Sequence, residues 1–125
     1  MEVAPMIPSL DGVHVFNEPA ALEQVDGDRQ LLQELLNLYL RSSQRLVSEL
    51  HQSVAAGDNV ATGRLAHSLK GASGNVAADR VRLLSATLEQ CMKNGKAVDG
   101  PAFVRIIQRE TEAFRALAMS VSVDP

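Results

Sequence analysis

The sequence predicts an all-α protein, an antiparallel up-down four-helix bundle with a short extra N-terminal helix. Three observations lead to this fold class. The 125 residues are 46% hydrophobic but only 3% aromatic, so the core must consist mainly of aliphatic side chains, which suits packed helices. Apolar residues recur at helical spacing in four long segments separated by short turns. Strict alternation of apolar and polar residues, which is typical of strands, is missing from the sequence.

The N-terminal half is predicted to contain an arm and two helices. Residues 1–17 contain prolines and a glycine without a sustained period, so we expect an arm or linker there. A short helix should follow Asn17, which can cap it, and should end at Gly27. A long helix is predicted from about Asp28 to Ala56, with a bend at Ser42-Ser43 and a stop at Gly57.

Three more helices are predicted in the second half. Asp58 or Asn59 can cap a helix over about residues 60–76. The next helix should run from about Asp79 to the Asn94-Gly95 pair. The sequence Asp99-Gly100-Pro101 opens a last helix that ends near Val121. Residues 18–121 are thus predicted to form the bundle, and residues 122–125 a C-terminal tail.

Composition excludes several classes of function. The net charge of −3 gives no support to nucleic-acid binding. No apolar run approaches the roughly 20 residues that span a bilayer, and the N-terminus does not read as a signal peptide. Cys91 is the only cysteine, which excludes an internal disulfide, favours a reducing compartment and suggests a core position. Three scattered histidines and one cysteine show no metal-ligand spacing, so no metal site is expected.

The helix over residues 60–76 carries an unusual histidine. On a helical wheel, the apolar side chains of this helix lie within roughly 40° of the pole opposite His67. We therefore expect this pole to face the core and His67 to point away from it. The apolar residues in question are Leu65, Leu69, Ala72 and Val76.

Glycines and cations share the predicted face of His67: Gly63, Gly71, Gly74, Lys70 and Arg64. Each glycine inside a helix costs about 1 kcal/mol relative to alanine. Three on one face make sense if something must approach the backbone closely beside the histidine. An exposed imidazole is a competent nucleophile near neutral pH, and a nearby cation would stabilise a phosphoryl group.

The segment His67-Ser68-Leu69-Lys70-Gly71-Ala72-Ser73 resembles the signature His-x-Leu-Lys-Gly-x-Ser of histidine-containing phosphotransfer (HPt) domains. The resemblance implies that His67 is phosphorylated, that Lys70 helps to hold the phosphoryl group and that Gly71 clears room for a receiver domain. Glu89 lies where many members have Gln or Glu, and would hydrogen-bond the other ring nitrogen and fix the tautomer. Ala77 departs from the family, in which many members have glycine at this turn.

The resemblance also implies a relay function. A receiver-domain aspartate of a response regulator would pass its phosphoryl group to Nε2 of His67, and a second receiver would accept it. Such a domain is not an enzyme with kinase activity of its own, and it needs no cofactor, because the receivers supply Mg²⁺. The expected partners are receiver domains, with a hybrid sensor histidine kinase as a further candidate, and neither nucleic acid nor membrane is expected. The expected state is a monomer in the cytoplasm, or in the cytoplasmic portion of a membrane-bound sensor kinase.

Two other functions compete with the relay. The chain could be a purely structural adaptor or dimerisation bundle, in which His67→Gln would leave all activity intact. It could also be the phosphorylated domain of a chemotaxis-type kinase, with ATP on a separate catalytic domain as the donor. His14 and His51 are interpreted as ordinary surface histidines.

Single site residues have alternatives of their own. Lys70 and Glu89 could be solvated charges, and Gly71 could mark a tight helix crossing instead of a docking notch. Gly63 lies near the helix start and could reflect loose packing of the first turn.

Overall fold

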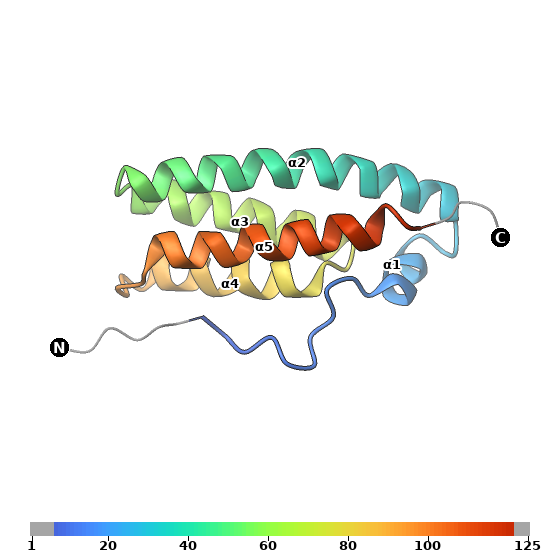
Figure 1. The fold of residues 1–125 in the computed structure, drawn as a ribbon, viewed down its shortest axis with the longest axis horizontal. Coiled ribbons are helices and arrows are strands. Elements are labelled where there is room, and N and C mark those ends of the chain that lie inside the picture. The colour runs from blue at the N-terminus through green and yellow to red at the C-terminus, as the bar shows by residue number, and fades with distance from the viewer. Residues whose placement is uncertain (1–6, 122–125) are drawn as a thin grey trace.

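The computed structural model describes residues 7–121, which form five helices (Figure 1). They are α1 (Glu18–Gln24), α2 (Arg29–Ala55), α3 (Asn59–Asn75), α4 (Asp79–Lys93) and α5 (Gly100–Ala118). The described residues contain no strand. The predicted fold class, a four-helix bundle with a short extra helix, is confirmed. The expected tail at residues 122–125 and the first six residues of the expected arm lie outside the described part of the chain.

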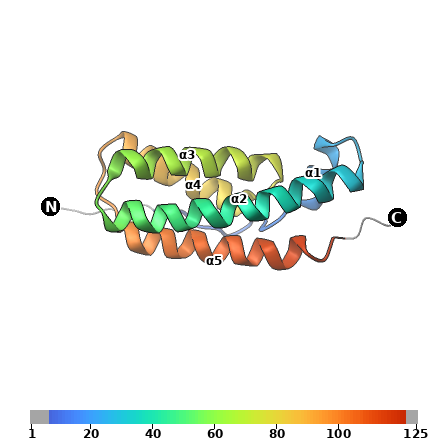
Figure 2. The same ribbon diagram turned by 90° about the horizontal axis from the view of Figure 1, so that it is seen from above.

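The four long helices occupy the corners of the bundle. In sequence order, α2 packs on α3, α3 on α4 and α4 on α5, and α5 closes the bundle against α2. Figure 2 shows α3 and α5 on opposite sides of α2. Short turns join successive helices from α2 to α5, so neighbours run antiparallel.

Side-chain caps fix most of the helix starts. A residue just before the helix accepts a hydrogen bond from the backbone N–H three residues on, which satisfies one orphan donor of the first turn. Asp58 rather than Asn59 caps α3, while α4 begins after Ala78 without a side-chain cap. The capping residues are Asn17 at 3.2 Å and Asp28, Asp58 and Asp99 at 3.0 Å.

The helix α2 runs without a break through the Ser42-Ser43 pair, where the sequence predicts a bend. Ser43 is buried, and its Oγ donates to the carbonyl oxygen of Leu40 at 3.4 Å. A serine that bonds back to its own helix keeps its hydroxyl satisfied without leaving helical geometry. The pair therefore does not interrupt the helix.

The core is mostly aliphatic, as predicted, with a small aromatic cluster at one end. The ring of Phe114 on α5 makes edge-on contacts at 5.0 Å with Tyr39 of α2 and with Phe16 of the N-terminal segment. Edge-to-face pairs at this spacing are favourable beyond the area they bury. The N-terminal segment therefore contributes a side chain to the hydrophobic core.

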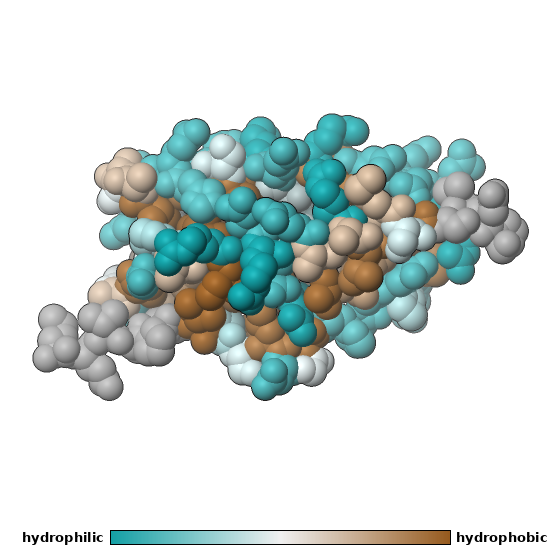
Figure 3. Space-filling model, in the orientation of Figure 1, coloured by the Kyte–Doolittle hydropathy of each residue, from teal (hydrophilic) through white to brown (hydrophobic). Residues whose placement is uncertain are grey.

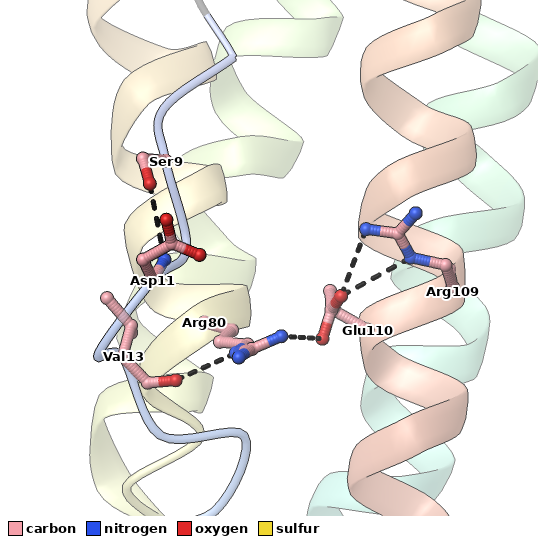
Figure 4. Close-up of polar contacts among 6 residues, drawn as sticks. All are labelled: Ser9, Asp11, Val13, Arg80, Arg109 and Glu110. Atoms are coloured by element: carbon pink, nitrogen blue, oxygen red, sulfur yellow. Dashed lines mark hydrogen bonds and ion pairs between the residues drawn. The ribbon is translucent and has the colours of Figure 1, made fainter.

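Arg80 of α4 hydrogen-bonds the backbone of the N-terminal segment and also forms an ion pair with α5 (Figure 4). Arg80 donates from Nε to the carbonyl oxygen of Val13 at 2.7 Å, and its backbone N–H donates to the carbonyl oxygen of His14 at 3.1 Å. The guanidinium also lies 3.6 Å from the buried carboxylate of Glu110, which Arg109 contacts at 3.2 Å. Figure 3 shows hydrophobic residues gathered along this segment, among hydrophilic ones.

The buried face of α3 is rotated from the predicted one. Thr62, Ala66, Leu69 and Ser73 are buried, whereas the predicted core residues Leu65 and Ala72 are only half-buried. Hydrogen bonds to α2 explain the rotation. The hydroxyl groups of Tyr39 and Ser73 lie 2.8 Å apart, and those of Ser53 and Thr62 lie 2.7 Å apart. Buried hydroxyl groups that pair with each other can occupy core positions, which hydrophobicity alone does not indicate.

The turn between α3 and α4 holds Ala77 in a left-handed conformation, with φ +55°. This conformation favours glycine because a Cβ atom crowds the following carbonyl oxygen. Ala77 nevertheless stays buried, and its carbonyl oxygen accepts a hydrogen bond from the backbone N–H of Asn17 at 3.0 Å. The turn geometry is thus compatible with alanine, at some cost in backbone strain.

Candidate functional site

The site centres on an exposed imidazole in the middle of α3. The side chain of His67 is 66% exposed, as the helical wheel predicts. Its Nδ1 lies 2.8 Å from Oε2 of Glu89, a residue of α4 that is only 7% exposed. The alternative that Glu89 is an ordinary exposed acid is therefore wrong. The two helices thus bring the carboxylate within hydrogen-bond distance of one nitrogen of an exposed imidazole.

The same carboxylate binds a lysine from α3. Nζ of Lys70 lies 2.7 Å from Oε1 of Glu89, so the two carboxylate oxygens serve two different partners. The hydrogen bond from Lys70 is the main cause that holds the pKa of Glu89 below its usual value. Burial opposes this shift by raising the pKa, and the contact with His67 lowers it further. Glu89 is consequently a carboxylate at neutral pH.

An ionised Glu89 determines what the imidazole can do. A carboxylate only accepts hydrogen bonds, so a neutral His67 must place its proton on Nδ1 to bond with it. The lone pair of the ring then lies on Nε2, which makes no hydrogen bond to any described residue. With the proton on Nδ1, the exposed imidazole can therefore offer Nε2 as a nucleophile.

A second lysine, which sequence reasoning missed, lies at the same carboxylate. Nζ of Lys93 is 4.0 Å from Oε2 of Glu89, and its side chain is 67% exposed. The two residues are four positions apart on α4, a spacing that places side chains on the same face of a helix. This spacing is visible in the sequence, but its meaning depends on knowing that Glu89 faces His67.

The three glycines of the predicted notch have different surroundings. A Cβ atom built at Gly71 would meet nothing within 4 Å, so the backbone there is open to a partner. A Cβ atom at Gly63 would lie 3.3 Å from Cβ of Met92, which ties this glycine to the close packing of α3 on α4. At Gly74 the nearest atom is Cδ of Arg82 at 3.5 Å, an ordinary contact.

Beside the imidazole, the start of α3 and the end of α4 enclose a shallow hollow of about 320 Å³. Arg64 is exposed and lines this hollow, so it can meet an approaching anionic or acidic group. Carbon atoms make up most of the surface that lines the hollow, although several of the lining residues are polar. One apolar residue of the lining, Val60, is 75% exposed. The full lining is Asn59, Val60, Gly63, Arg64, His67, Glu89, Met92 and Lys93.

The other chemistry-bearing residues lie away from this site. Nε2 of His51 pairs with Oε1 of Gln108 on the α2–α5 side at 2.7 Å, and His14 lies in the N-terminal segment. Cys91 is buried, as predicted, and burial raises the pKa of its thiol. The described residues contain no group of three side chains suited to hold a metal ion. Among them, no helix is long and apolar enough to cross a membrane.

Three comparisons with known proteins show what the chain is similar to. Residues 34–117 match the sequence model of the Hpt domain family. The chain is 26% identical over 97 residues to the phosphorelay intermediate protein rdeA of Dictyostelium discoideum. This alignment covers 78% of the chain but only 38% of that relative.

Solved structures share the fold. Histidine-containing phosphotransfer protein B from Pseudomonas aeruginosa PAO1 superposes with a TM-score of 0.77 at 25% identity, over 84% of this chain and 91% of that one. The HPT domain of a sensor hybrid histidine kinase from Shewanella superposes with a TM-score of 0.71 at 19% identity, over 88% and 98% of the two chains.

Proposed function

The chain belongs to the Hpt domain family of phosphorelay carriers, and we propose that it receives a phosphoryl group on Nε2 of His67 from one receiver domain and passes it to another. The observation that carries this proposal is the bond between Nδ1 of His67 and the buried carboxylate of Glu89 at 2.8 Å. It leaves Nε2 as the nucleophilic atom on an exposed ring.

The transfer needs no proton movement at the reacting nitrogen. The lone pair of Nε2 attacks the phosphorus of an aspartyl phosphate, the N–P bond forms, and the P–O bond to the aspartate breaks. The bonding electrons leave with the aspartate as a carboxylate. The ring gains positive character while Nδ1 keeps its proton, and the ionised Glu89, which accepts the hydrogen bond from this N–H group, stabilises the product. The reverse steps pass the group to the second receiver.

Lys70 is the cation of this chain that can neutralise the phosphoryl oxygens. Its side chain is 36% exposed and lies on the same face of α3 as His67, three residues further on. The Mg²⁺ ion that receivers use in this chemistry would be bound in the acidic pocket of the partner. We therefore assign this chain no cofactor and no kinase activity of its own, only the role of a covalent carrier.

A receiver can dock beside Gly71 because the backbone there is open. The neighbouring surface of α2 carries apolar side chains that a solvated monomer has no need to expose. Leu38 is 53% exposed and Leu31 is 40% exposed. Leu38 and Ala72 also line one small depression between α2 and α3. The exposed side chains of Leu31 and Leu38 bound the proposed docking surface on one side of the imidazole, and the cation Arg64 bounds it on the other. The protein that carries this surface is proposed to be a monomer in the cytoplasm.

Labelling by phosphorylated receiver domains tests the proposal. A panel of receivers charged with acetyl phosphate should transfer an acid-labile label to the chain, since a phosphoramidate hydrolyses in acid and a serine phosphate does not. His67→Gln should abolish the label without changing the helix content measured by circular dichroism. His51→Gln is the matched control, because it removes another exposed histidine and should keep the label.

Two results would contradict the proposed function. A label retained in His67→Gln would place the acceptor elsewhere. A label obtained only from an ATP-dependent kinase domain, and from no receiver, would favour the chemotaxis-type function.

A further inference from the structure

Three positively charged or proton-donating groups converge on Glu89. Oε1 contacts Nζ of Lys70 at 2.7 Å, and Oε2 contacts Nδ1 of His67 at 2.8 Å. Lys93 is the third, with Nζ 4.0 Å from Oε2. Among the described residues, Glu89 forms ion pairs with these three partners only. Lys93 lines the hollow beside His67, so its charge lies next to the reacting ring.

The proposed reaction places competing demands on Lys70. In the unphosphorylated structure it neutralises Glu89, whose side chain is only 9% exposed. A phosphoryl group on Nε2 adds close to two negative charges on the same face of α3. Once Lys70 turns toward that group, Oε1 of a mostly buried carboxylate loses its partner. Leaving one oxygen of a buried carboxylate without a partner is costly, and the carboxylate would tend to move out toward water.

We propose that Lys93 is a positioning residue that takes over Glu89 when Lys70 turns to the phosphoryl group. This inference rests on the proposed function. Lys93 keeps the carboxylate of Glu89 hydrogen-bonded to Nδ1 of His67 during the transfer and in the phosphorylated state. In the unphosphorylated protein Lys70 alone is enough to neutralise Glu89, and Nζ of Lys93 stays 4.0 Å from the carboxylate.

The geometry of α4 suits Lys93 to this role. It lies four residues after Glu89, so a small change of side-chain torsions closes the 4.0 Å gap without backbone movement. Its side chain is 67% exposed and flexible, so little must be desolvated or unpacked before it moves. It is also in the last turn of α4, where a cation is favoured by the helix dipole.

The test uses the full chain and phosphoramidate as donor, so that no partner has to be known. Transfer of its phosphoryl group to Nε2 of His67 releases ammonia. Lys93→Gln should slow labelling on the order of two- to five-fold, which is the range of a partly exposed ion pair. Lys93→Arg should restore the rate. Lys96→Gln, which removes another exposed lysine beyond the end of α4, is the matched control and should label at the wild-type rate.

Nitrogen-15 and proton NMR of the imidazole separates positioning from a general structural role. In Lys93→Gln the hydrogen-bonded Nδ1 proton of His67 should persist in the unphosphorylated protein and be lost to exchange after phosphorylation. In the wild type and in Lys93→Arg it should persist in both states.

Three results would overturn the inference. Lys93→Gln could behave like Lys96→Gln in both measurements, which would leave Lys93 without a role. The Nδ1 proton could already be lost before phosphorylation, which would make Lys93 a structural partner of Glu89. If His67 of the wild type accepts no label from phosphoramidate or from any phosphorylated receiver, the proposed function fails and the role of Lys93 fails with it.

Discussion

Gly71 allows docking and folding to be separated by one substitution. It lies inside α3, is exposed, and has nothing within 4 Å of the Cβ atom that alanine would add. Glycine in a helix interior is less favourable than alanine by about 0.8–1.0 kcal/mol. Since no contact opposes the new methyl group, Gly71→Ala should raise the free energy of unfolding by about this amount. For a chain of this length, that corresponds to a rise in Tm of about 3–5 °C.

Urea and thermal unfolding followed by circular dichroism would measure this gain. Gly63→Ala is the matched control, because it adds the same methyl group to the same helix at a position where Cβ of Met92 lies only 3.3 Å away. It should gain clearly less than Gly71→Ala, or lose stability. If Gly71→Ala destabilises the domain, the glycine serves packing and the open backbone has been misinterpreted.

Docking at the same position should respond in the opposite direction. Gly71→Gln places a long side chain where a receiver would approach the backbone, so the Kd for a receiver domain should rise by about ten-fold or more, equivalent to 1.4 kcal/mol. Helix content and Tm should not fall. Equal losses of stability and affinity would contradict the assignment of Gly71 to the docking surface.

Three further substitutions test contacts that support the site. Tyr39→Phe should destabilise the domain by about 1–3 kcal/mol in urea unfolding, because it leaves the buried hydroxyl of Ser73 without its partner at 2.8 Å; the double variant with Ser73→Ala should recover part of the loss. Ala77→Gly should stabilise the domain by about 1 kcal/mol, because it relieves a left-handed backbone with φ +55°; a Tm at or below that of the wild type would contradict this. The pKa of Glu89 is lowered from 4.5 in the folded state, so its ionic contacts stabilise the protein above about pH 5, and this contribution is lost as pH falls through the lowered pKa. The stability difference between wild type and Glu89→Gln should therefore shrink in acid, and a difference that grows below pH 4 would be inconsistent with a lowered pKa.

The elements and the position of His67 could be predicted because they depend on local signals. Capping side chains, glycine stops and helical periodicity set the helix bounds to within a few residues. The exposure of His67 follows from the apolar residues opposite it. The sequence raised a packing role for Gly63 only from its place near the helix start, because the wheel puts Gly63 and Gly71 on the same side and only the position of α4 shows which one is covered.

Buried polar residues explain why the buried face of α3 differs from the predicted one. Ser73 belongs to the signature segment, yet it is fully buried and pairs with Tyr39 in the core. Thr62 is also buried, and its hydroxyl group pairs with that of Ser53. A hydrophobicity pattern assigns such residues to the surface, which is why the predicted face of α3 was rotated. Lys93 was missed for a related reason, since its only signal is a four-residue spacing from Glu89 on α4, and that spacing does not show that Glu89 faces His67.

Small residues of α3 also account for the geometry at the imidazole. Gly63 lies against Met92 and Gly74 against Arg82, so the side of α3 that faces α4 carries small residues and the two helices can approach closely. Only a close approach lets a carboxylate on α4 reach Nδ1 of a histidine that is itself exposed. A core of larger side chains on this side would move α4 outward and leave Nδ1 to water. The glycines of α3 therefore have two effects: Gly71 leaves the backbone open on the proposed docking surface, and Gly63 and Gly74 let α4 approach closely enough for Glu89 to reach Nδ1 of His67.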